Sequence, residues 1–327
     1  MNRRPLVPIL GLFFIVGCGG TTVQLSVLRP AQLNAAEHGG TMSIGEFRVS
    51  DPNWYQAGTL IAQDLRQRVV GVEGGVVRFM ESGGGLIIHG QLLDHTYAER
   101  VTTQAATCSR TEGTGQAART VNYPCTEYTR TGQSHVNIIF NVSTSGGQAV
   151  TATTFEDNST SSTTARDQQP AAIDGDGMLR ALREGLTERF AHVILPWRET
   201  VAVHFQDCEA GAEALCERGV QLVQGGDYPN AVGAFEQAAS AIDNSTSTVA
   251  PADRASPHWN RALALEYSGR YPEAIMAFGR AIELDPGESD YREELANVQR
   301  MQSDAERLRQ QGLGTSQAED VQSAAAQ

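Results

Sequence analysis

Two stretches of this 327-residue chain, 212–245 and 255–288, repeat one pattern of residues over 34 positions. The matched residues are Gly219, Leu222, Gly226, Tyr228, Ala231, Phe235 and Ala238 in the first stretch, and Ala262, Leu265, Gly269, Tyr271, Ala274, Phe278 and Ala281 in the second. Small residues at helical spacing let two helices pack closely, and the central glycine suits the left-handed turn that ends a first helix. Each stretch is therefore predicted to form two antiparallel helices.

This pattern resembles the tetratricopeptide repeat, a helix–turn–helix unit of 34 residues. The second stretch also carries Trp259, Asn260 and the closing Pro286, whereas Asp243 replaces that proline in the first. Two such repeats are fewer than the roughly three that usually make a stable stack. We therefore expect the repeat module to dock on the part of the chain that precedes it.

Three further segments belong to the C-terminal half of the chain. Residues 244–254, rich in Ser, Thr, Pro and Ala, are expected to loop out between the repeats. Residues 289–311 are expected to form a polar capping helix, so that the whole module spans 212–311. The tail 312–327, rich in Gln, Ser and Ala, is expected to be disordered.

The resemblance implies that the module binds a protein or peptide on its concave face, which is lined by the first helix of each repeat. Carried over by position, the residues of that face are Glu217, Val220 and Gln224 in the first repeat, and Trp259, Asn260, Leu263, Glu266 and Tyr267 in the second. The alternative is that these side chains pack against the preceding domain or face solvent. Because the chain contains no lysine, the lysine-dependent clamp for a C-terminal carboxylate is not expected.

The first 17 residues have the features of a bacterial export signal. Two arginines precede a short apolar run, and residues 15–18 read Ile-Val-Gly-Cys. This resembles the lipobox of bacterial lipoproteins, which implies cleavage before Cys18, lipidation of its sulfur and a short tether over 18–22. Because Gly19 is not the aspartate that retains lipoproteins in the inner membrane of enteric bacteria, we expect an outer-membrane lipoprotein facing the periplasm. The alternative is an ordinary secretory signal with an incidental cysteine.

Four more cysteines follow, and an even number in an exported protein favours disulfides. The sequence alone allows three connectivities. We predict the two local pairs, Cys108 with Cys125 and Cys208 with Cys216. Zinc is the alternative, but the chain has no CxxC pair and no histidine at ligand spacing near these cysteines, so no metal site is expected.

Residues 23–206 are expected to form an α+β domain made of a sheet with two packed helices. Segments of strand-forming residues alternate with two amphipathic helices, which are predicted over 51–68 and 177–194. Two polar segments, 103–120 and 158–170, are expected to be long mobile loops because they are rich in Thr, Ser, Gly and Gln.

Several residues of this domain carry a second resemblance. They are Arg29 and Pro30 at the end of the opening strand, Ile87, Ile88, Gly90 and Gln91 in a strand before a long loop, and a hairpin over 136–155. Together with the order of the elements, they resemble the periplasmic α/β domain of lipoproteins such as the curli export channel and the penicillin-binding-protein activators. The resemblance implies a role in envelope assembly or regulation.

The net charge and the lack of lysine exclude several classes of function. The net charge of −13 becomes about −15 without the two leader arginines, and such a surface disfavours nucleic acid as a partner. All 25 basic residues are arginine, which excludes chemistry that requires a lysine. We expect a non-enzymatic envelope lipoprotein without a cofactor, acting as a protein–protein interaction scaffold or as an assembly or regulatory factor. The alternatives are a periplasmic hydrolase whose site is assembled from loops and a purely structural tether. The oligomeric state stays open.

Overall fold

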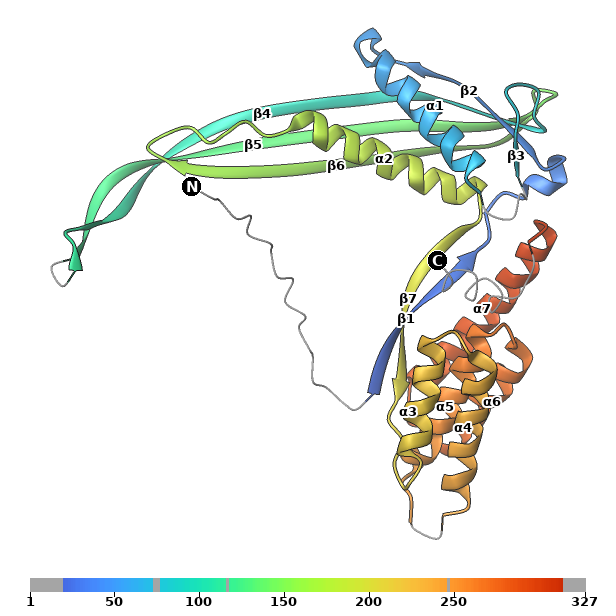
Figure 1. Cartoon of the computed structure of the whole chain (residues 1–327). Coiled ribbons are helices and arrows are strands. Elements are labelled where there is room, and N and C mark those ends of the chain that lie inside the picture. Colours follow the sequence, from blue (N-terminus) through green and yellow to red (C-terminus); the bar gives the residue numbers. More distant parts are fainter. Residues whose placement is uncertain (1–19, 73–76, 116–117, 246–247, 314–327) are drawn as a thin grey trace, which may run out of the picture. The chain divides into compact units, whose positions relative to one another are not determined.

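The computed structural model describes residues 20–72, 77–115, 118–245 and 248–313 (Figure 1). The chain is α+β and divides into two compact units. One unit contains Pro30–Trp197 with Leu308–Leu313, and the other contains the strand that ends at Arg29 with Arg198–Arg307. No helix in the described ranges is both long and apolar enough to span a membrane. The export signal, Cys18 and the tail beyond residue 313 lie outside the described residues.

The Pro30–Trp197 unit is built on a five-stranded mixed sheet with the strand order β3-β2-β4-β5-β6. The strands are β2 (Thr41–Val49), β3 (Arg78–Phe79), β4 (Leu86–Glu112), β5 (Arg119–Thr144) and β6 (Ala149–Arg166). Strand β2 pairs in parallel with both of its neighbours, whereas β4, β5 and β6 form antiparallel pairs.

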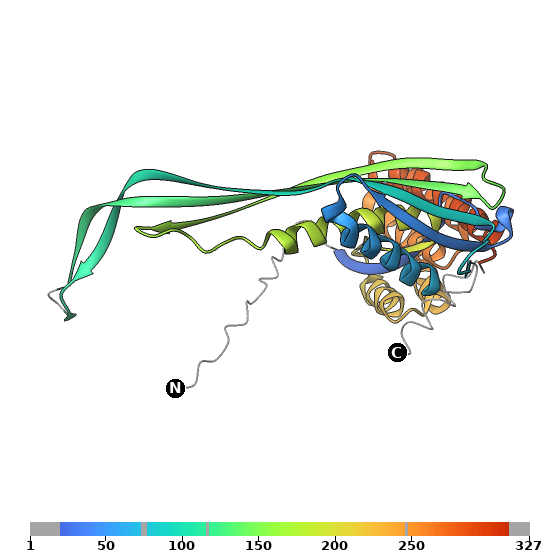
Figure 2. The same cartoon turned by 90° about the horizontal axis from the view of Figure 1, so that it is seen from above.

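Two helices, α1 (Tyr55–Val70) and α2 (Gly175–Ile194), cover one face of this sheet, as Figure 2 shows from above. Both lie close to where the sequence predicts them. Two short 3-10 helices, Ala35–His38 and Pro52–Trp54, precede β2 and α1. The Asp174 side chain caps α2 by accepting a hydrogen bond from Gly177 N at 2.9 Å, which offsets one of the free N–H groups of the first turn.

The core of this unit follows from alternation along the strands. Val136, Ile138, Phe140 and Val142 of β5 are buried on the face that the helices cover. The Phe140 ring stacks on Phe190 of α2, with 4.1 Å between ring centroids. A Cβ at Gly90 would lie 2.2 Å from the carbonyl oxygen of Ile139 and 2.5 Å from the Phe47 ring, so only glycine fits there.

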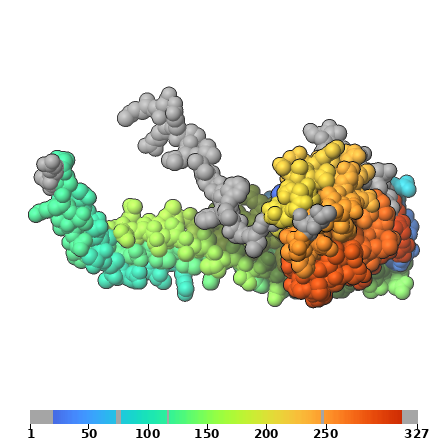
Figure 3. Space-filling model, turned by 90° about the horizontal axis from the view of Figure 1, so that it is seen from below, coloured from blue at the N-terminus to red at the C-terminus, as the bar shows by residue number. Residues whose placement is uncertain are grey.

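The two segments expected to be loops, 103–120 and 158–170, belong largely to strands, and that prediction is wrong. The β4–β5 ladder continues to the pair Glu112–Arg119, and β6 pairs with β5 as far as Arg166. Threonine has a high strand propensity, but side chains that are polar on both faces remove the alternation from which a strand is recognised. Figure 3 shows the distal part of this hairpin as a narrow projection, which we call the arm (residues 98–132).

A disulfide joins the two strands of the arm. Cys108 lies opposite Tyr123 and Cys125 lies opposite Ala106, so the two cysteines form a diagonal pair. Their Cα atoms are 5.8 Å apart, and both side chains are buried although their neighbours along the strands are largely exposed. The predicted pairing of Cys108 with Cys125 is confirmed.

The second unit combines a two-stranded sheet with five helices. The strands are β1 (Gly20–Arg29) and β7 (Trp197–Gln206), and the helices are α3 (Glu213–Gln224), α4 (Tyr228–Asp243), α5 (Pro251–Tyr267), α6 (Tyr271–Leu284) and α7 (Asp290–Gln310). Residues 20–22, expected as tether, are the start of β1. The expected insertion 244–254 is shorter than predicted, because Pro251 occupies the first turn of α5, where its fixed φ is favourable.

The domain boundary expected at residue 206 differs from the division between the units. Strands β1 and β7, which the sequence assigns to the first domain, share a core with the C-terminal helices. The apolar side chains of these strands in that core are Val23, Leu25, Val27, Val203 and Phe205. The Phe205 ring stacks on Phe235 of α4, with 5.8 Å between centroids. These alternating residues bury one face of the two-stranded sheet against the helices, which explains the shared unit.

The small residues of the repeated pattern act as the sequence analysis expects. A Cβ at Gly219 of α3 would lie 2.5 Å from the Phe235 ring, so the glycine lets α3 and α4 approach closely. Gly226 and Gly269 both have a φ of 76°, the left-handed conformation that favours glycine at the end of a helix. Each glycine is followed by the next helix of its pair, α4 or α6.

Candidate functional site

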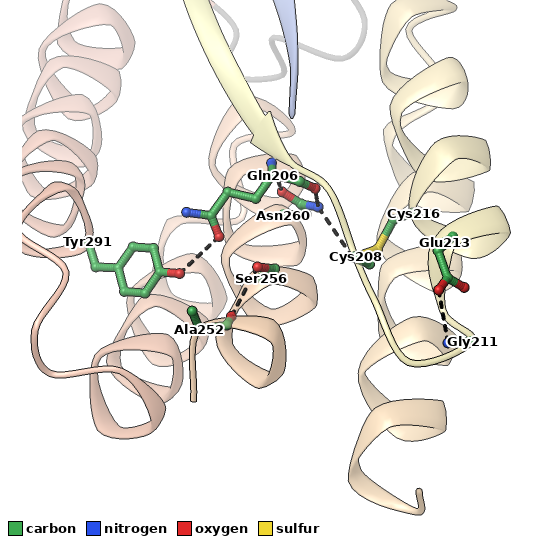
Figure 4. Close-up of a disulfide and its surroundings, with 9 residues drawn as sticks. All are labelled: Gln206, Cys208, Gly211, Glu213, Cys216, Ala252, Ser256, Asn260 and Tyr291. Atoms are coloured by element: carbon green, nitrogen blue, oxygen red, sulfur yellow. Dashed lines mark hydrogen bonds between the residues drawn. A yellow bond between two sulfur atoms is a disulfide. The ribbon is translucent and has the colours of Figure 1, made fainter. Parts of the chain in front are cut away.

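The end of strand β7 lies on helix α5, and side chains of α5 hold its backbone. The Asn260 Oδ1 accepts a hydrogen bond from Gln206 N at 2.8 Å, and its Nδ2 donates to Gln206 O at 2.7 Å (Figure 4). The indole nitrogen of Trp259 donates to His204 O at 3.1 Å. From α7, the Tyr291 hydroxyl donates to the Gln206 side-chain oxygen at 2.9 Å. An extended segment of the chain is thus bound through both its backbone and a side chain.

This segment occupies part of the surface that the sequence assigns to a partner on the second repeat, at Trp259 and Asn260. The five residues expected there are all buried, with exposed fractions of 6% for Trp259, 0% for Asn260, 1% for Leu263, 0% for Glu266 and 5% for Tyr267. They are closed to a partner in this structure, which corrects the expectation of an open groove at these five positions. These five side chains pack within the chain, which is the alternative to a binding groove. The end of β7 lies against Trp259 and Asn260, whose side chains bind its backbone. Glu266 instead has its hydrogen-bond partner on α7, where Asn297 donates to it.

The three residues expected on the first repeat are placed differently, because they line an open pocket of about 520 Å³. Glu217 and Gln224 are exposed, and Val220 forms part of the wall. The pocket lies between α3, the end of β7 and the segment that follows β7. Its lining residues are Thr21, Phe205, Gln206, Asp207, Cys208, Glu209, Glu213, Cys216, Glu217, Val220, Gln221 and Gln224.

One wall of the pocket is fixed by the second disulfide. Cys208 follows β7, Cys216 lies on α3, and their Cα atoms are 6.0 Å apart (Figure 4). The predicted pairing of Cys208 with Cys216 is confirmed. The disulfide holds residues 207–209 beside α3. These residues, which follow the part of β7 bound to α5, form one edge of the pocket. No pocket is expected here from the sequence, although the close spacing of Cys208 and Cys216 indicates that the segment after β7 is tied to α3.

The pocket is acidic. Four of its lining residues are Asp207, Glu209, Glu213 and Glu217, and among the described residues that line it none is basic. Glu213 accepts a hydrogen bond from Gly211 N at 3.2 Å, so one of its oxygens stabilises the turn before α3. Carboxylates gathered in a concave site concentrate negative potential there, which favours a cationic ligand.

Glu266 is a buried carboxyl group on α5. Its Oε1 accepts a hydrogen bond from Asn297 Nδ2 at 3.1 Å, while Oε2 is buried without a hydrogen-bond partner among the described residues. Burial raises the pKa of Glu266 to about 10, and the nearby carboxylate of Glu294 acts in the same direction. The group is therefore a neutral acid at pH 7, not an anionic contact for a partner.

The described residues contain no group of three or more His, Cys, Asp or Glu side chains placed to hold a metal ion. The chemistry that the pocket offers is ion pairing and hydrogen bonding, with a small apolar contribution from Val220, which is 8% exposed.

No family model matches the chain, and no curated protein matches its sequence. Among solved structures, a dodecameric PelC variant from Paraburkholderia phytofirmans matches with a TM-score of 0.25 and 13% sequence identity, covering 54% of this chain and 98% of the PelC chain.

Proposed function

We propose that the chain is a non-enzymatic lipoprotein of the cell envelope, and that its C-terminal helices are tetratricopeptide repeats which hold a partner protein. The observation that carries the proposal is the open pocket of about 520 Å³ at Glu217, Val220 and Gln224. These three positions are the ones that the repeat family uses on its concave face. The closely packed helix pairs α3–α4 and α5–α6, with their glycine-ended first helices, further support the assignment.

The way α5 holds β7 supports a peptide-binding role for this face. Asn260 binds both backbone groups of Gln206, a contact that depends on the extended backbone and not on the identity of the side chain. A surface that already binds one extended segment by such contacts is suited to a second one beside it. In this proposal β7 is an internal ligand of the second repeat, and the pocket on the first repeat is left for a partner.

The cellular location is part of the proposal. Two disulfides agree with an exported protein, since such bonds persist in oxidising compartments. We place the lipid on Cys18 and the mature chain on the outer membrane, facing the periplasm. Replacement of Cys18 by serine should abolish lipid labelling and release the protein into the soluble fraction. Persistent labelling of that variant would refute the anchor, and fractionation of the native protein with the inner membrane would refute the destination.

Site-specific crosslinking tests the scaffold role in living cells. A photoreactive amino acid at Gln224, which is exposed and lines the pocket, should give a discrete adduct with one or a few envelope proteins. The same amino acid at Met276 of α6 is the control, because that side chain is 68% exposed and lies outside the pocket lining. Equal adducts at both positions, or none at Gln224, would refute binding at this pocket.

A further inference from the structure

The acidic pocket has the shape and chemistry to select its ligand. Two of its carboxylates, Glu217 on α3 and Glu209 before it, belong to different segments that the Cys208–Cys216 disulfide holds together. Glu217 is exposed, and among the described residues its side chain accepts a hydrogen bond from Gln221 Nε2 at 3.5 Å. Its second carboxylate oxygen is therefore available to a ligand. A volume of about 520 Å³ falls within the range of sites that take a small ligand or a few side chains.

The neighbouring surface of the same unit indicates what form the ligand takes. There an extended backbone is seated, with Gln206 bound through its N–H and C=O by Asn260. Gln206 itself also lines the pocket, so the pocket is continuous with the surface of α5 that binds β7. The bound end of β7 therefore indicates the form of the ligand, which is an extended peptide. Such a peptide could cross the pocket along α3.

The walls indicate which side chains such a peptide would carry. Val220 in the wall is 8% exposed, and the aliphatic stem of arginine or lysine could pack on this part of its side chain. The carboxylates and the amides of Gln221 and Gln224 can then accept hydrogen bonds from the charged head. A bare metal ion suits the pocket less, because the described residues bring no three ligating side chains together.

We propose that this pocket binds an extended, arginine- or lysine-bearing segment of the partner protein. The inference rests on the proposed scaffold function and deepens it by naming the class of ligand. The cationic side chains enter between Glu209 and Glu217, and the peptide backbone runs along α3 next to the end of β7. Because the chain itself has no lysine and carries a net charge of −13, such a partner would also be attracted over a distance.

A defined peptide tests the proposal with the full mature protein. The probe is a fluorescein-labelled tetra-arginine amide, and the matched peptide is tetra-citrulline amide, in which a neutral urea replaces each guanidinium. Fluorescence anisotropy at low and at near-physiological salt should show binding of the arginine peptide at both, and much weaker binding of the citrulline peptide. Equal binding of the two peptides would overturn the assignment of a cationic ligand.

Two paired substitutions separate the pocket from the overall charge. The double variant Glu209→Gln with Glu217→Gln should weaken binding of the arginine peptide by about tenfold or more. The control, Glu81→Gln with Glu293→Gln, removes the same charge at two exposed positions outside the pocket and should change the affinity little. Circular dichroism checks that both variants are folded. Equal losses in the two variants would mean a long-range charge effect only, and would overturn the proposal.

The peptide-binding test and the crosslinking test can fail independently, so the cationic ligand and the scaffold function are tested separately. If crosslinks form at Gln224 while the arginine peptide fails to bind, the pocket holds a partner of another chemistry, and only the cationic assignment is overturned. If neither experiment succeeds, both proposals fail.

Discussion

The side-chain amide of Asn260 binds both backbone groups of Gln206, accepting from the N–H at 2.8 Å and donating to the C=O at 2.7 Å. Asn260 itself is fully buried. This single side chain therefore replaces the hydrogen bonds that a neighbouring strand would give to the end of β7. If these helices are tetratricopeptide repeats, as we propose, Asn260 stands at a ligand-binding position of that family, and a segment of the same chain fills it.

Replacing Asn260 with alanine should lower the free energy of unfolding by about 2–4 kcal/mol. Both backbone groups of Gln206 lose their partner, and an unsatisfied buried polar group costs about 1–3 kcal/mol. Urea denaturation followed by circular dichroism measures the change. Asn122→Ala, at an exposed position of β5, is the control and should change stability by less than about 0.5 kcal/mol. Equal stability of the two variants would contradict the role of Asn260.

Trp259 is expected to act as a core residue. Its ring stacks on Tyr291 at 4.8 Å and contacts Phe278 edge-on at 5.3 Å between centroids. Trp259→Ala should therefore destabilise the fold by about 3–5 kcal/mol, whereas Trp259→Phe keeps an aromatic ring and removes the hydrogen bond to His204 O. Thermal unfolding should rank the variants in that order. If Trp259→Ala were as stable as the native protein but bound a partner more weakly, Trp259 would be a binding residue of an open groove and not a core residue.

Glu266 should make the unfolding free energy depend on pH. In the folded protein its pKa is about 10, well above the ordinary value of 4.5 that it regains on unfolding. Its contribution to stability is thus complete below pH 4.5 and is lost as the pH rises toward 10, by at most about 1.4 kcal/mol per pH unit. Urea denaturation at several pH values would measure the slope.

The variant Glu266→Gln removes this titration while its amide oxygen can still accept the hydrogen bond from Asn297. It should match the native protein near pH 4 and be more stable at pH 8. The control Glu293→Gln changes an exposed carboxyl on α7 and should leave the pH slope unchanged. A Glu266→Gln variant with the native slope would show that another group causes it.

Replacing both Cys108 and Cys125 with serine should loosen the arm while the rest of the sheet stays folded. The arm residues around the disulfide are largely exposed and contribute little to the apolar core. Closure of a loop of about this length stabilises by roughly 3 kcal/mol in the chain-entropy model. Amide hydrogen exchange should show lower protection over 100–131, with protection at Ile138 and Phe140 unchanged. Uniform loss of protection would contradict an independently fraying arm.

Several elements could be predicted from the sequence because each depends on local chemistry. Asp174 is a good N-cap, and it caps α2. Gly226 and Gly269 stand at the same position of the two repeated stretches, and both have the positive φ that favours glycine. Gly219 stands where the second stretch has Ala262, and it lies against the Phe235 ring. The disulfides follow from the close spacing of their cysteines.

Other elements could not be predicted, because their signals depend on distant partners. The polar strands of the arm pair with each other and bury few side chains, so their pattern shows no hydrophobic period. The burial of Asn260 and Glu266 depends on β7 and α7, which lie far from α5 in sequence or outside its repeat. A family pattern assigns such residues to a groove, but it does not say what fills that groove.

The diagonal disulfide of the arm also restricts the alternative pairings of its strands. When both faces of a hairpin are polar, sliding one strand past the other changes little in burial, so several alignments have similar energies. A register shift of one residue would place the Cys108 and Cys125 side chains on opposite faces of the hairpin. A shift of two residues in the direction that moves the cysteines apart would separate their Cα atoms by more than the roughly 7 Å that a disulfide spans. Formation of the disulfide would therefore fix one strand register among several of similar energy. In most sheets the burial of apolar side chains fixes the register.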